Sequence, residues 1–364
     1  GLRAELIELG RQQALPAPRA QPGAFTAGYA TTADGASFTV PLRVTISLDS
    51  APPPAPTVAA APAPATVAGR PQQLDPDVEA ALADAEASRE RPYYLKRTDA
   101  QKRERYYADV PPGAEDKALF SALSKLATDK HTNPKRYDPK KHVYPWVDLH
   151  PDLQLRSIYS GKTFPPQQLI REDARIEAAQ KRLNEIVASG REASALEVAA
   201  LEAQAQEPFN CEHVVPQSTF AKDEPMRGDL HHLFACESRC NSFRGNTPYF
   251  DFADFEEKIQ QDCGKREGTE ANAKFEPSNG KGAVARATLY FLLRYPGLIG
   301  DRAVELQASQ LPLLLEWHRL EPVGEWELHR NAAIEEIQGN RNPLIDHPDW
   351  ATKIDFAAGF GQST

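Results

Sequence analysis

A twenty-residue stretch near the start of the chain, residues 51–70, constrains the fold more than any other feature. It reads APPPAPTVAAAPAPATVAGR and contains six prolines and eight alanines. Proline lacks the backbone N–H that helices and strands use, and alanine buries too little surface to build a core. The segment therefore predicts an extended linker. The main domain is expected over residues 71–355, followed by a short tail at 356–364.

Residues 1–50 come before this linker and contain one clear strand pattern. Residues 38–49, FTVPLRVTISLD, alternate apolar and polar side chains and include several β-branched residues. Such a pattern is typical of a half-buried strand. We therefore interpret residues 1–50 as the end of an upstream region of the same polypeptide, which is a candidate partner of the main domain.

Charge and hydropathy limit the classes of function. The chain has 364 residues, 41% of them hydrophobic, and a net charge of −9. No apolar run approaches the roughly 18 residues that a membrane helix needs, so no membrane partner is expected. Negative net charge does not exclude nucleic acid, because the local field at a cleft decides binding. Residues 91–105 and 130–142 cluster Lys and Arg beside Tyr. These clusters are either a solvated surface or phosphate contacts.

Helical patterns dominate the main domain. Residues 142–161 predict a strand, a turn and another strand, and residues 209–250 are short and irregular. We predict an α+β fold, a mostly helical domain around this irregular region. Helices are expected at residues 75–90, 113–130, 280–297, 311–320 and 325–339, with a helical hairpin over 166–206 that breaks at Ser189-Gly190.

The stretch CEHVVPQSTF, residues 211–220, places an acid and a base side by side. Hydrolysis of a phosphodiester needs a base for the attacking water and a divalent cation to neutralise charge. Glu212 and Asn241 offer oxygens for a hard cation, and His213 offers a base that works near neutral pH. Neighbouring side chains on a strand point to opposite faces, so convergence requires a bend, which Pro216 favours.

Several motifs in order resemble the endonuclease I family of bacteria. They are CEHVVPQS, MRGDLHHLF and CNSFRGNTP, together with residues 155–161, 275–296 and 325–350. The similarity covers roughly residues 80–350. These are secreted or periplasmic-type nucleases of the His-Me finger superfamily, mostly without sequence preference. The resemblance implies a small ββα-metal core at about residues 209–250.

The resemblance also implies roles for individual residues. His213 would be the general base that activates water. Glu212 and Asn241 would hold the catalytic magnesium, or another divalent cation such as manganese or calcium. The implied function is endonucleolytic hydrolysis of DNA, or of RNA, to 5′-phosphate and 3′-hydroxyl ends.

One departure from the family concerns an arginine that contacts the cleaved phosphate in some members. The connection that would carry it, TFAKDEPMRG, is short here. Arg227 or Arg244 could substitute, and we include Arg244 among the catalytic candidates. The alternative is that Arg244 forms a structural ion pair. His231 and His232 are adjacent, and we interpret at least one of them as packing or hydrogen-bonding behind the site, with catalysis assigned to neither.

The four cysteines, Cys211, Cys236, Cys240 and Cys263, flank the proposed site. Four thiolates in a compact region suit a structural zinc, which is the leading prediction. Two disulfides and four free thiols are the alternatives. Zinc would indicate an intracellular protein, whereas disulfides would indicate a secreted or periplasmic one.

Two other functions compete with the nuclease. A zinc-organised module could bind nucleic acid without catalysis, but binding does not require the complete set of Glu212, His213 and Asn241. A zinc protease is disfavoured because the chain contains no H-E-x-x-H motif.

Overall fold

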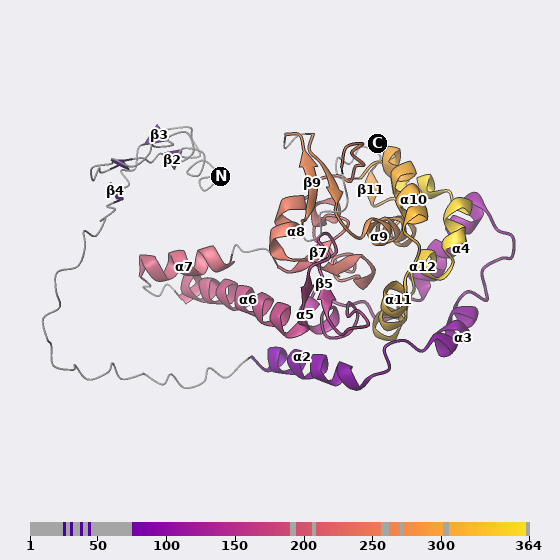
Figure 1. Cartoon of the computed structure of the whole chain (residues 1–364), viewed down its shortest axis with the longest axis horizontal. Helices are drawn as coiled ribbons and strands as arrows, with labels where there is room; N and C mark the ends of the chain where they lie inside the picture. The colour runs from indigo at the N-terminus through magenta and orange to yellow at the C-terminus, as the bar shows by residue number, and fades with distance from the viewer. Residues whose placement is uncertain are drawn as a thin grey trace, which may run out of the picture. The chain divides into compact units, whose positions relative to one another are not determined.

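The computed structural model describes residues 75–189, 194–205, 209–255, 262–269, 272–300 and 306–361, and four short strands before residue 45. The chain divides into two compact units, Gly1–Pro71 and Gln72–Thr364. Figure 1 draws the elements of both.

In the first unit, the described residues form four strands of two residues each. They pair antiparallel as β1 with β4 and β2 with β3. Most of the strand predicted at 38–49, and all of the linker predicted at 51–70, lie outside the described residues. The strand bounds are Phe25–Thr26 for β1, Ala30–Thr31 for β2, Ser37–Phe38 for β3 and Arg43–Val44 for β4.

One buried helix, α9 (Lys281–Arg294), organises the second unit. Residues 281–293 are all buried, as expected for a helix that is apolar on most sides. The helices α4 (Asp116–Asp129) and α10 (Leu311–Leu320) pack against it. A Cβ on Gly282 would lie 2.6 Å from the Cβ of Glu321, so glycine permits the close approach of α9 and the end of α10.

Helices form in each predicted helical segment, and the fold class is α+β as expected. Asp75 caps α2 by accepting from the Asp77 N–H, and Pro76 occupies the first turn. None of the described helices is long and apolar enough to span a membrane. The other helices of this unit are α2 (Pro76–Ala87), α3 (Lys96–Tyr106), α5 (Pro139–His142), α6 (Pro166–Ser189), α7 (Ala195–Ala205), α8 (Ser238–Arg244), α11 (Glu325–Gln338) and α12 (Pro343–Asp346). Of these, α3, α5 and α12 were not predicted from the sequence, and α8 was implied only by the family resemblance.

The prediction for residues 142–161 was wrong in its first half. Asp138 and Pro139 start the short helix α5, and turns follow it up to residue 149. Val143 and Val147 are fully buried there, so the alternating apolar residues reflect burial in turns rather than a strand. A short antiparallel pair does form further along, between β5 (Leu155–Arg156) and β6 (Thr163–Phe164).

A short hairpin of β7 (Cys211–His213) and β8 (Leu233–Ala235) separates two hydrophobic clusters. The strands pair antiparallel, with Cys211 opposite Ala235 and His213 opposite Leu233. Leu233 and Ala235 belong to the cluster under α6 and α11, whereas Phe234 and Cys236 belong to the cluster around α9. The hairpin is therefore buried on both faces, as the two-residue period of a strand allows.

A buried ion pair fixes β8 to the helical frame. Arg330 on α11 pairs with Asp148, and both side chains are at most 2% exposed. Arg330 also donates to the backbone oxygens of Leu230 and Leu233, and Asp148 accepts from the Ala235 N–H at 2.6 Å. Burial raises the pKa of Asp148, and the Arg330 guanidinium opposes this rise.

We predict that Arg330→Ala lowers the free energy of unfolding by about 3–5 kcal/mol, because it leaves Asp148 buried without its partner. Urea denaturation followed by circular dichroism measures this. The matched control is Arg319→Ala, whose exposed partner is Glu316 and whose unfolding midpoint should stay nearly unchanged. Equal midpoints for the two variants would contradict the role assigned to Arg330.

Candidate active site

The hairpin and the helix α8 bring the predicted site residues onto one ββα unit. β7 carries Glu212 and His213, and α8, which follows β8 after two residues, carries Asn241. The strand ends at His213, and the chain bends before a short 3-10 helix that begins after Pro216. The predicted bend is therefore confirmed, and so is the predicted order of two strands and a helix.

Glu212 is a buried carboxylate with one fully used oxygen. Its side chain is 2% exposed. Its Oε1 accepts from the Tyr159 hydroxyl at 2.7 Å and from Arg244 Nη1 at 2.7 Å. Among the described residues, its Oε2 makes no hydrogen bond. Burial raises the pKa of Glu212, and the Arg244 guanidinium counteracts that effect. The carboxylate thus keeps one oxygen for a further partner.

Arg244 is buried and directs its guanidinium inward. Its Nε donates to the Thr247 carbonyl at 3.2 Å, and its Nη2 donates to the Val214 carbonyl at 3.0 Å. Its Nη1 donates hydrogen bonds to Glu212 Oε1 and to the backbone oxygen of His213. This geometry corrects the prediction that Arg244 contacts phosphate, because every nitrogen of the guanidinium has a protein partner. The alternative, a structural ion pair, describes Arg244.

His213 is held by a backbone carbonyl. Its Nε2 lies 3.0 Å from the carbonyl oxygen of Arg227. A carbonyl only accepts, so Nε2 carries the proton and Nδ1 of the neutral ring is left as an acceptor. Burial and the nearby His232 lower the pKa of His213 well below its usual range. The ring is therefore neutral near pH 7 and able to take a proton at Nδ1.

Asn241 has an amide whose orientation is fixed. Its Nδ2 donates to the backbone carbonyls of Phe209 at 3.1 Å and Cys211 at 3.0 Å. Two carbonyl acceptors require the NH₂ group on that side, so Oδ1 points away from them. Within the described part of the chain, Oδ1 has no hydrogen-bond partner. Asn241 thus lies against the strand residue that precedes Glu212 and presents a free oxygen.

The structure does not join Glu212 and His213 directly. Their side chains share no hydrogen bond among the described residues, as expected for strand neighbours on opposite faces. The Glu212 carboxylate contacts Tyr159 and Arg244, whereas the centroid of the His213 ring lies 4.8 Å from that of the Tyr137 ring. Any ligand that engages both must therefore span the end of the strand.

Arg227 remains the arginine with an outward-facing surface near His213. It is half-buried, its Nε donates to Gln217 Oε1 at 3.1 Å, and its guanidinium lies 5.0 Å from the Tyr137 ring centroid. Its backbone carbonyl is the group that orients His213. Of the two arginines proposed from the sequence, Arg227 is the one whose position suits a phosphate.

His231 and His232 support the hairpin from behind. His231 Nε2 lies 3.2 Å from the Asn340 carbonyl, and His232 Nε2 contacts the Met226 carbonyl at 2.6 Å. Both side chains are buried. These contacts agree with the packing role expected from the sequence.

Two tyrosines of the site were missed by the sequence reasoning. Tyr159 donates to Glu212, and its hydroxyl lies 2.7 Å from that of Tyr249, whose ring is covered by the Arg244 guanidinium at 4.9 Å. Tyr159 lies within residues 155–161, and Tyr249 directly follows the motif CNSFRGNTP. Nothing in the spacing indicated that their hydroxyls meet at Glu212.

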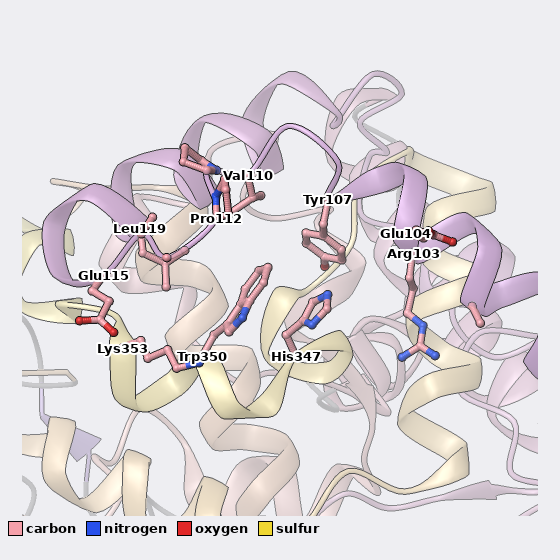
Figure 2. A pocket seen from close by; sticks show the side chains of 14 residues that line it. Arg103, Glu104, Tyr107, Val110, Pro112, Glu115, Leu119, His347, Trp350 and Lys353 are labelled. Atoms are coloured by element: carbon pink, nitrogen blue, oxygen red, sulfur yellow. The ribbon is translucent and has the colours of Figure 1, made fainter.

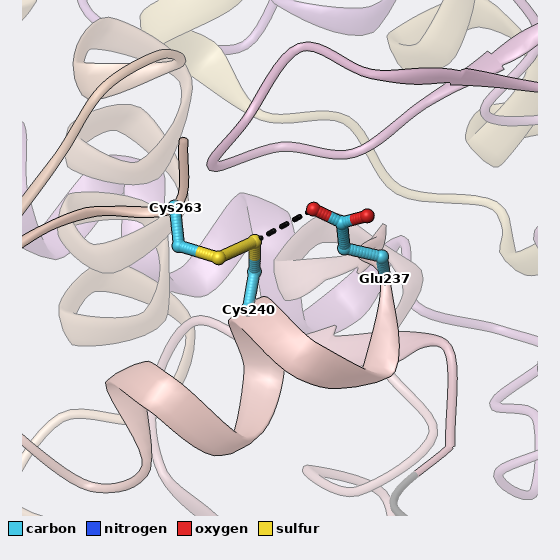
Figure 3. A group of neighbouring side chains, drawn as sticks. All are labelled: Glu237, Cys240 and Cys263. Atoms are coloured by element: carbon cyan, nitrogen blue, oxygen red, sulfur yellow. Dashed lines mark hydrogen bonds between the residues drawn. A yellow bond between two sulfur atoms is a disulfide. The ribbon is translucent and has the colours of Figure 1, made fainter. Parts of the chain in front are cut away.

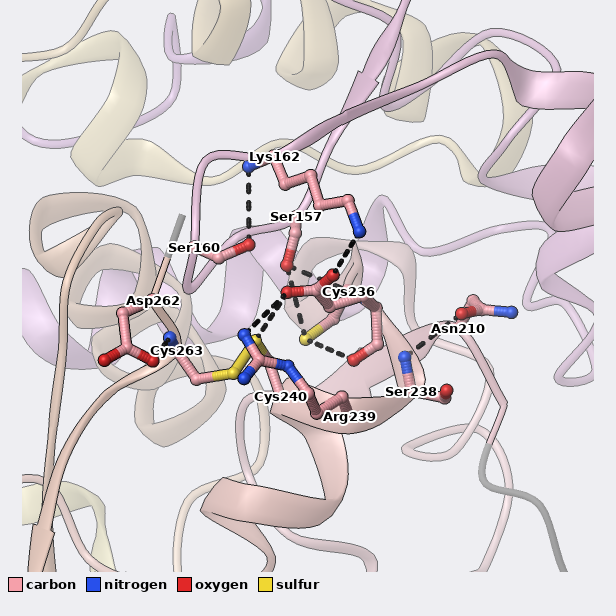
Figure 4. The surroundings of a disulfide bond; sticks show 11 residues. Ser157, Ser160, Lys162, Asn210, Cys236, Ser238, Arg239, Cys240, Asp262 and Cys263 are labelled. Atoms are coloured by element: carbon pink, nitrogen blue, oxygen red, sulfur yellow. Dashed lines mark hydrogen bonds and ion pairs between the residues drawn. A yellow bond between two sulfur atoms is a disulfide. The ribbon is translucent and has the colours of Figure 1, made fainter. Parts of the chain in front are cut away.

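The cysteines differ from the leading prediction. Cys240 and Cys263 form a disulfide, whereas Cys211 and Cys236 are buried free thiols. Four thiolates are therefore not available for zinc, and the arrangement is one disulfide rather than two. Figure 4 shows the bond joining α8 to the segment that leads into β9 (Gly264–Glu267). Because Cys240 directly precedes Asn241, the bond anchors the turn of α8 that carries the free amide oxygen.

Glu237 lies beside this disulfide. Its Oε1 is 2.9 Å from Cys240 Sγ (Figure 3), and the three side chains Glu237, Cys240 and Cys263 are close enough to surround an ion. A disulfide sulfur carries no thiolate charge, and metal binding by cysteine requires the thiolate. In the oxidised protein this group is thus not a metal centre.

A separate cavity of about 550 Å³ lies between α3, the start of α4 and the C-terminal segment (Figure 2). Its aromatic wall contains His347 stacked on Trp350 at 4.1 Å, with Tyr107 edge-on to both. None of Glu212, His213 or Asn241 lines it. It is therefore not part of the candidate active site.

Comparison with known proteins defines the class of this chain. The model of the endonuclease I family matches residues 156–349, which is more than half of the chain and includes the whole ββα unit. The chain belongs to the endonuclease I family. The family predicted from the sequence, and with it the nuclease class, is confirmed.

Individual relatives are nucleases found outside the cytoplasm. An extracellular ribonuclease of Bacillus subtilis is 35% identical over 166 residues, covering 40% of this chain and 54% of the relative. An extracellular deoxyribonuclease of Aeromonas hydrophila is 34% identical over 125 residues, which cover 33% of this chain and 50% of the relative. A periplasmic deoxyribonuclease of the same organism is 33% identical over 130 residues, which cover 35% of this chain and 50% of the relative. The chain thus spans about half the length of these curated relatives.

We predict that two thiols per chain react with a thiol reagent in denaturant, and four after reduction. Replacing Cys240 and Cys263 by serine should lower the free energy of unfolding by about 3 kcal/mol, because the bond closes a loop with a sequence separation of 23 residues. Ser242→Ala, an exposed change on the same helix, is the control. Four reactive thiols without reduction, with one zinc per chain, would restore the zinc prediction.

Proposed function

We propose that the domain over residues 71–355 is a divalent-cation-dependent endonuclease with little sequence preference. One observation carries the proposal. Three side chains of a single ββα unit each have one atom of the required kind that no described residue uses, namely Glu212 Oε2, Asn241 Oδ1 and His213 Nδ1. Membership in the endonuclease I family supports the same activity.

The proposed cation would be held by Glu212 and Asn241. Both offer hard oxygen donors, and the second groups on each side chain are already bonded to protein, so the free oxygens are fixed in direction. This donor set fits magnesium, manganese or calcium better than a thiophilic metal. When bound, such a cation neutralises negative charge on the phosphate and on the leaving oxygen.

His213 is the proposed general base. Its Nδ1 takes a proton from the water that attacks phosphorus. The bond between phosphorus and the 3′ oxygen breaks, and a second water molecule protonates the leaving 3′ oxygen. The Arg227 carbonyl keeps the ring in the tautomer that leaves Nδ1 free, and it stabilises the imidazolium through the Nε2–H. The products are a 5′-phosphate and a 3′-hydroxyl. The Arg227 guanidinium is positioned to contact the phosphate oxygens.

Glu212 has to be ionised to bind a cation, and its surroundings support that state. A carboxylate in an apolar environment would protonate, but Arg244 and the Tyr159 hydroxyl stabilise the charge. Arg244 and Tyr159 are therefore positioning residues in this proposal, since they act through Glu212.

The names of the relatives support a proposal for the substrate and the cellular location of this protein. Their names include both a ribonuclease and deoxyribonucleases, so we propose nucleic acid as the substrate, DNA first and RNA second. They also include extracellular and periplasmic proteins. Together with the Cys240–Cys263 disulfide, this supports a secreted or periplasmic location. The rival zinc-organised binding module loses its basis, because its four thiolates are not available.

The first experiment incubates plasmid DNA and a structured RNA with the full chain, with magnesium or with EDTA. We expect cleavage that EDTA abolishes. His213→Ala should lower the rate by about 10²–10⁴-fold, the usual contribution of a general base. The control is His142→Ala, which alters a half-buried histidine outside the site and should leave the rate unchanged.

A gel in which the plasmid is retarded but never shortened would favour a binding module. An unchanged rate in His213→Ala, with cleavage intact in the parent protein, would reject the proposed base while leaving the nuclease activity standing.

A second prediction concerns pH. Burial raises the Glu212 pKa and Arg244 lowers it, so Arg244→Gln removes the lowering influence. The carboxyl is then protonated up to a higher pH, and the acidic limb of the activity profile moves toward higher pH. Rates measured from pH 5 to 9, below the melting temperature of the variant, test this. Arg239→Gln, an exposed change on the same helix, should keep the parent profile; a parental profile in Arg244→Gln would refute the coupling.

A further inference from the structure

A cavity of about 870 Å³ adjoins the candidate active site. Three segments form its walls: the loop that follows α8, the hairpin of β9 and β10 (Lys274–Pro277), and the 3-10 turn that begins α10. Its volume is in the range of cavities that bind small ligands and nucleotides. The mechanism proposed above uses none of the side chains that face into it.

The cavity shares structure with the active site. The Tyr249 ring lines the cavity, while its hydroxyl meets the Tyr159 hydroxyl that donates to Glu212. Asn246, on the same wall, donates to the hydroxyl of Ser218 at 3.2 Å, in the 3-10 helix (Gln217–Phe220) just beyond His213. The loop after α8 therefore contributes residues to the wall of the cavity and also contacts the residues around the site.

Two amide side chains in the wall are oriented by backbone N–H groups. The Thr269 N–H donates to Asn272 Oδ1 at 2.8 Å, and the Gln310 N–H donates to the side chain of Gln307. A backbone N–H needs an acceptor, so in both amides the oxygen is used and the NH₂ group is left for another partner. Both residues line the cavity. Each amide thus offers hydrogen-bond donors.

Two cations add to this donor surface. Arg266 is exposed and donates through Nε to Thr247 Oγ1 at 3.0 Å, and Lys274 Nζ lies 3.8 Å from the Phe250 ring centroid. Neither forms an ion pair with a residue in the described ranges. By contrast, the neighbouring Lys265 does not line the cavity and pairs with two carboxylates.

One carboxylate, Asp251, is found among the described residues that line the cavity. Its Oδ1 lies 3.4 Å from Lys281 Nζ and 3.4 Å from Trp317 Nε1. These contacts partly neutralise it. The wall therefore offers an excess of donors and positive charge, and its best complement is a ligand rich in acceptors and negative charge.

We propose that this cavity binds a nucleotide of an unpaired strand, close to the phosphate that is cleaved. The inference rests on the proposed nuclease function and extends it to substrate choice. Arg266 and Lys274 contact phosphate oxygens, the amides of Asn272 and Gln307 donate to base carbonyls, and the Phe250 ring packs against the base. A base inside a duplex is stacked and paired, so only a splayed base can enter a concave site of this kind.

The test compares the full chain with the double variant Arg266→Ala/Lys274→Ala on two substrates, a 20-nucleotide single strand and the duplex of the same sequence. For the single strand we expect KM to rise about tenfold, a modest loss for two phosphate contacts, with kcat unchanged. For the duplex kcat/KM should stay within about twofold. The duplex thus serves as the internal check that the variant is folded and active.

The salt dependence gives an independent readout. Each phosphate contact on a single strand contributes about 0.7 to the slope of log affinity against log salt, so the double variant should lose about 1.4 from that slope. A fluorescein-labelled 20-nucleotide strand, with EDTA present to prevent cleavage, measures the slope by anisotropy.

The matched control is Lys265→Ala/Arg319→Ala. It removes the same charge from two residues that do not line the cavity, one of them on the opposite face of β9 beside Arg266. It should behave as the parent protein on both substrates. An equal loss in control and test variants would indicate a general charge effect and overturn the inference.

The remaining outcomes distinguish a failure of the strand preference, of the binding site and of the proposed function. Equal losses on single strand and duplex would reject the preference for an unpaired strand. Unchanged kinetics on both substrates would reject the site. No cleavage of either substrate by the parent protein would reject the proposed function, and the anisotropy measurement would then decide the binding site alone.

Discussion

The buried ion pair between Glu212 and Arg244 is the interaction on which the site depends. Its partners are each 2% exposed and 2.7 Å apart, so neither charge is tolerable without the other. The same arginine bonds to backbone oxygens on both sides of the strand end. One side chain therefore sets the charge of the carboxylate and the path of the backbone that presents His213. The geometry of the acid and of the base is consequently coupled.

The position of the hairpin explains why this pair can be so deeply buried. β7 and β8 separate two hydrophobic clusters, and their alternating side chains fill both. A strand pair of three residues each would be marginal alone in water. Here α9 and α11 supply the surroundings, and the Asp148–Arg330 pair ties the second strand to α11. The rigidity of the site is thus a property of the helical frame rather than of the small sheet.

Sequence patterns predicted most of the longer helices because these depend on periodicity and caps that are local in the chain, and the resemblance to the endonuclease I family implied the ββα unit. They did not predict the Tyr159–Tyr249 contact or the Cys240–Cys263 pairing, since both join segments that are distant in sequence. For the cysteines, the spacing favoured a zinc site and left disulfides as an alternative, because it does not show which thiols meet in the fold. The first of the two strands expected within residues 142–161 failed for another reason: burial of alternate residues in turns imitates a strand pattern.

The disulfide also changes the effect of a proteolytic cut near the site. It closes a loop from Cys240 to Cys263 that contains most of α8 and Tyr249. A single cut of a peptide bond inside this loop would leave both fragments covalently joined, so Asn241 would remain tethered to the body of the domain. Such a nicked protein would migrate as one band without reductant and as two with it. Wherever a protease cuts the folded chain within this loop, the bond would keep the two halves of the site together after one cleavage.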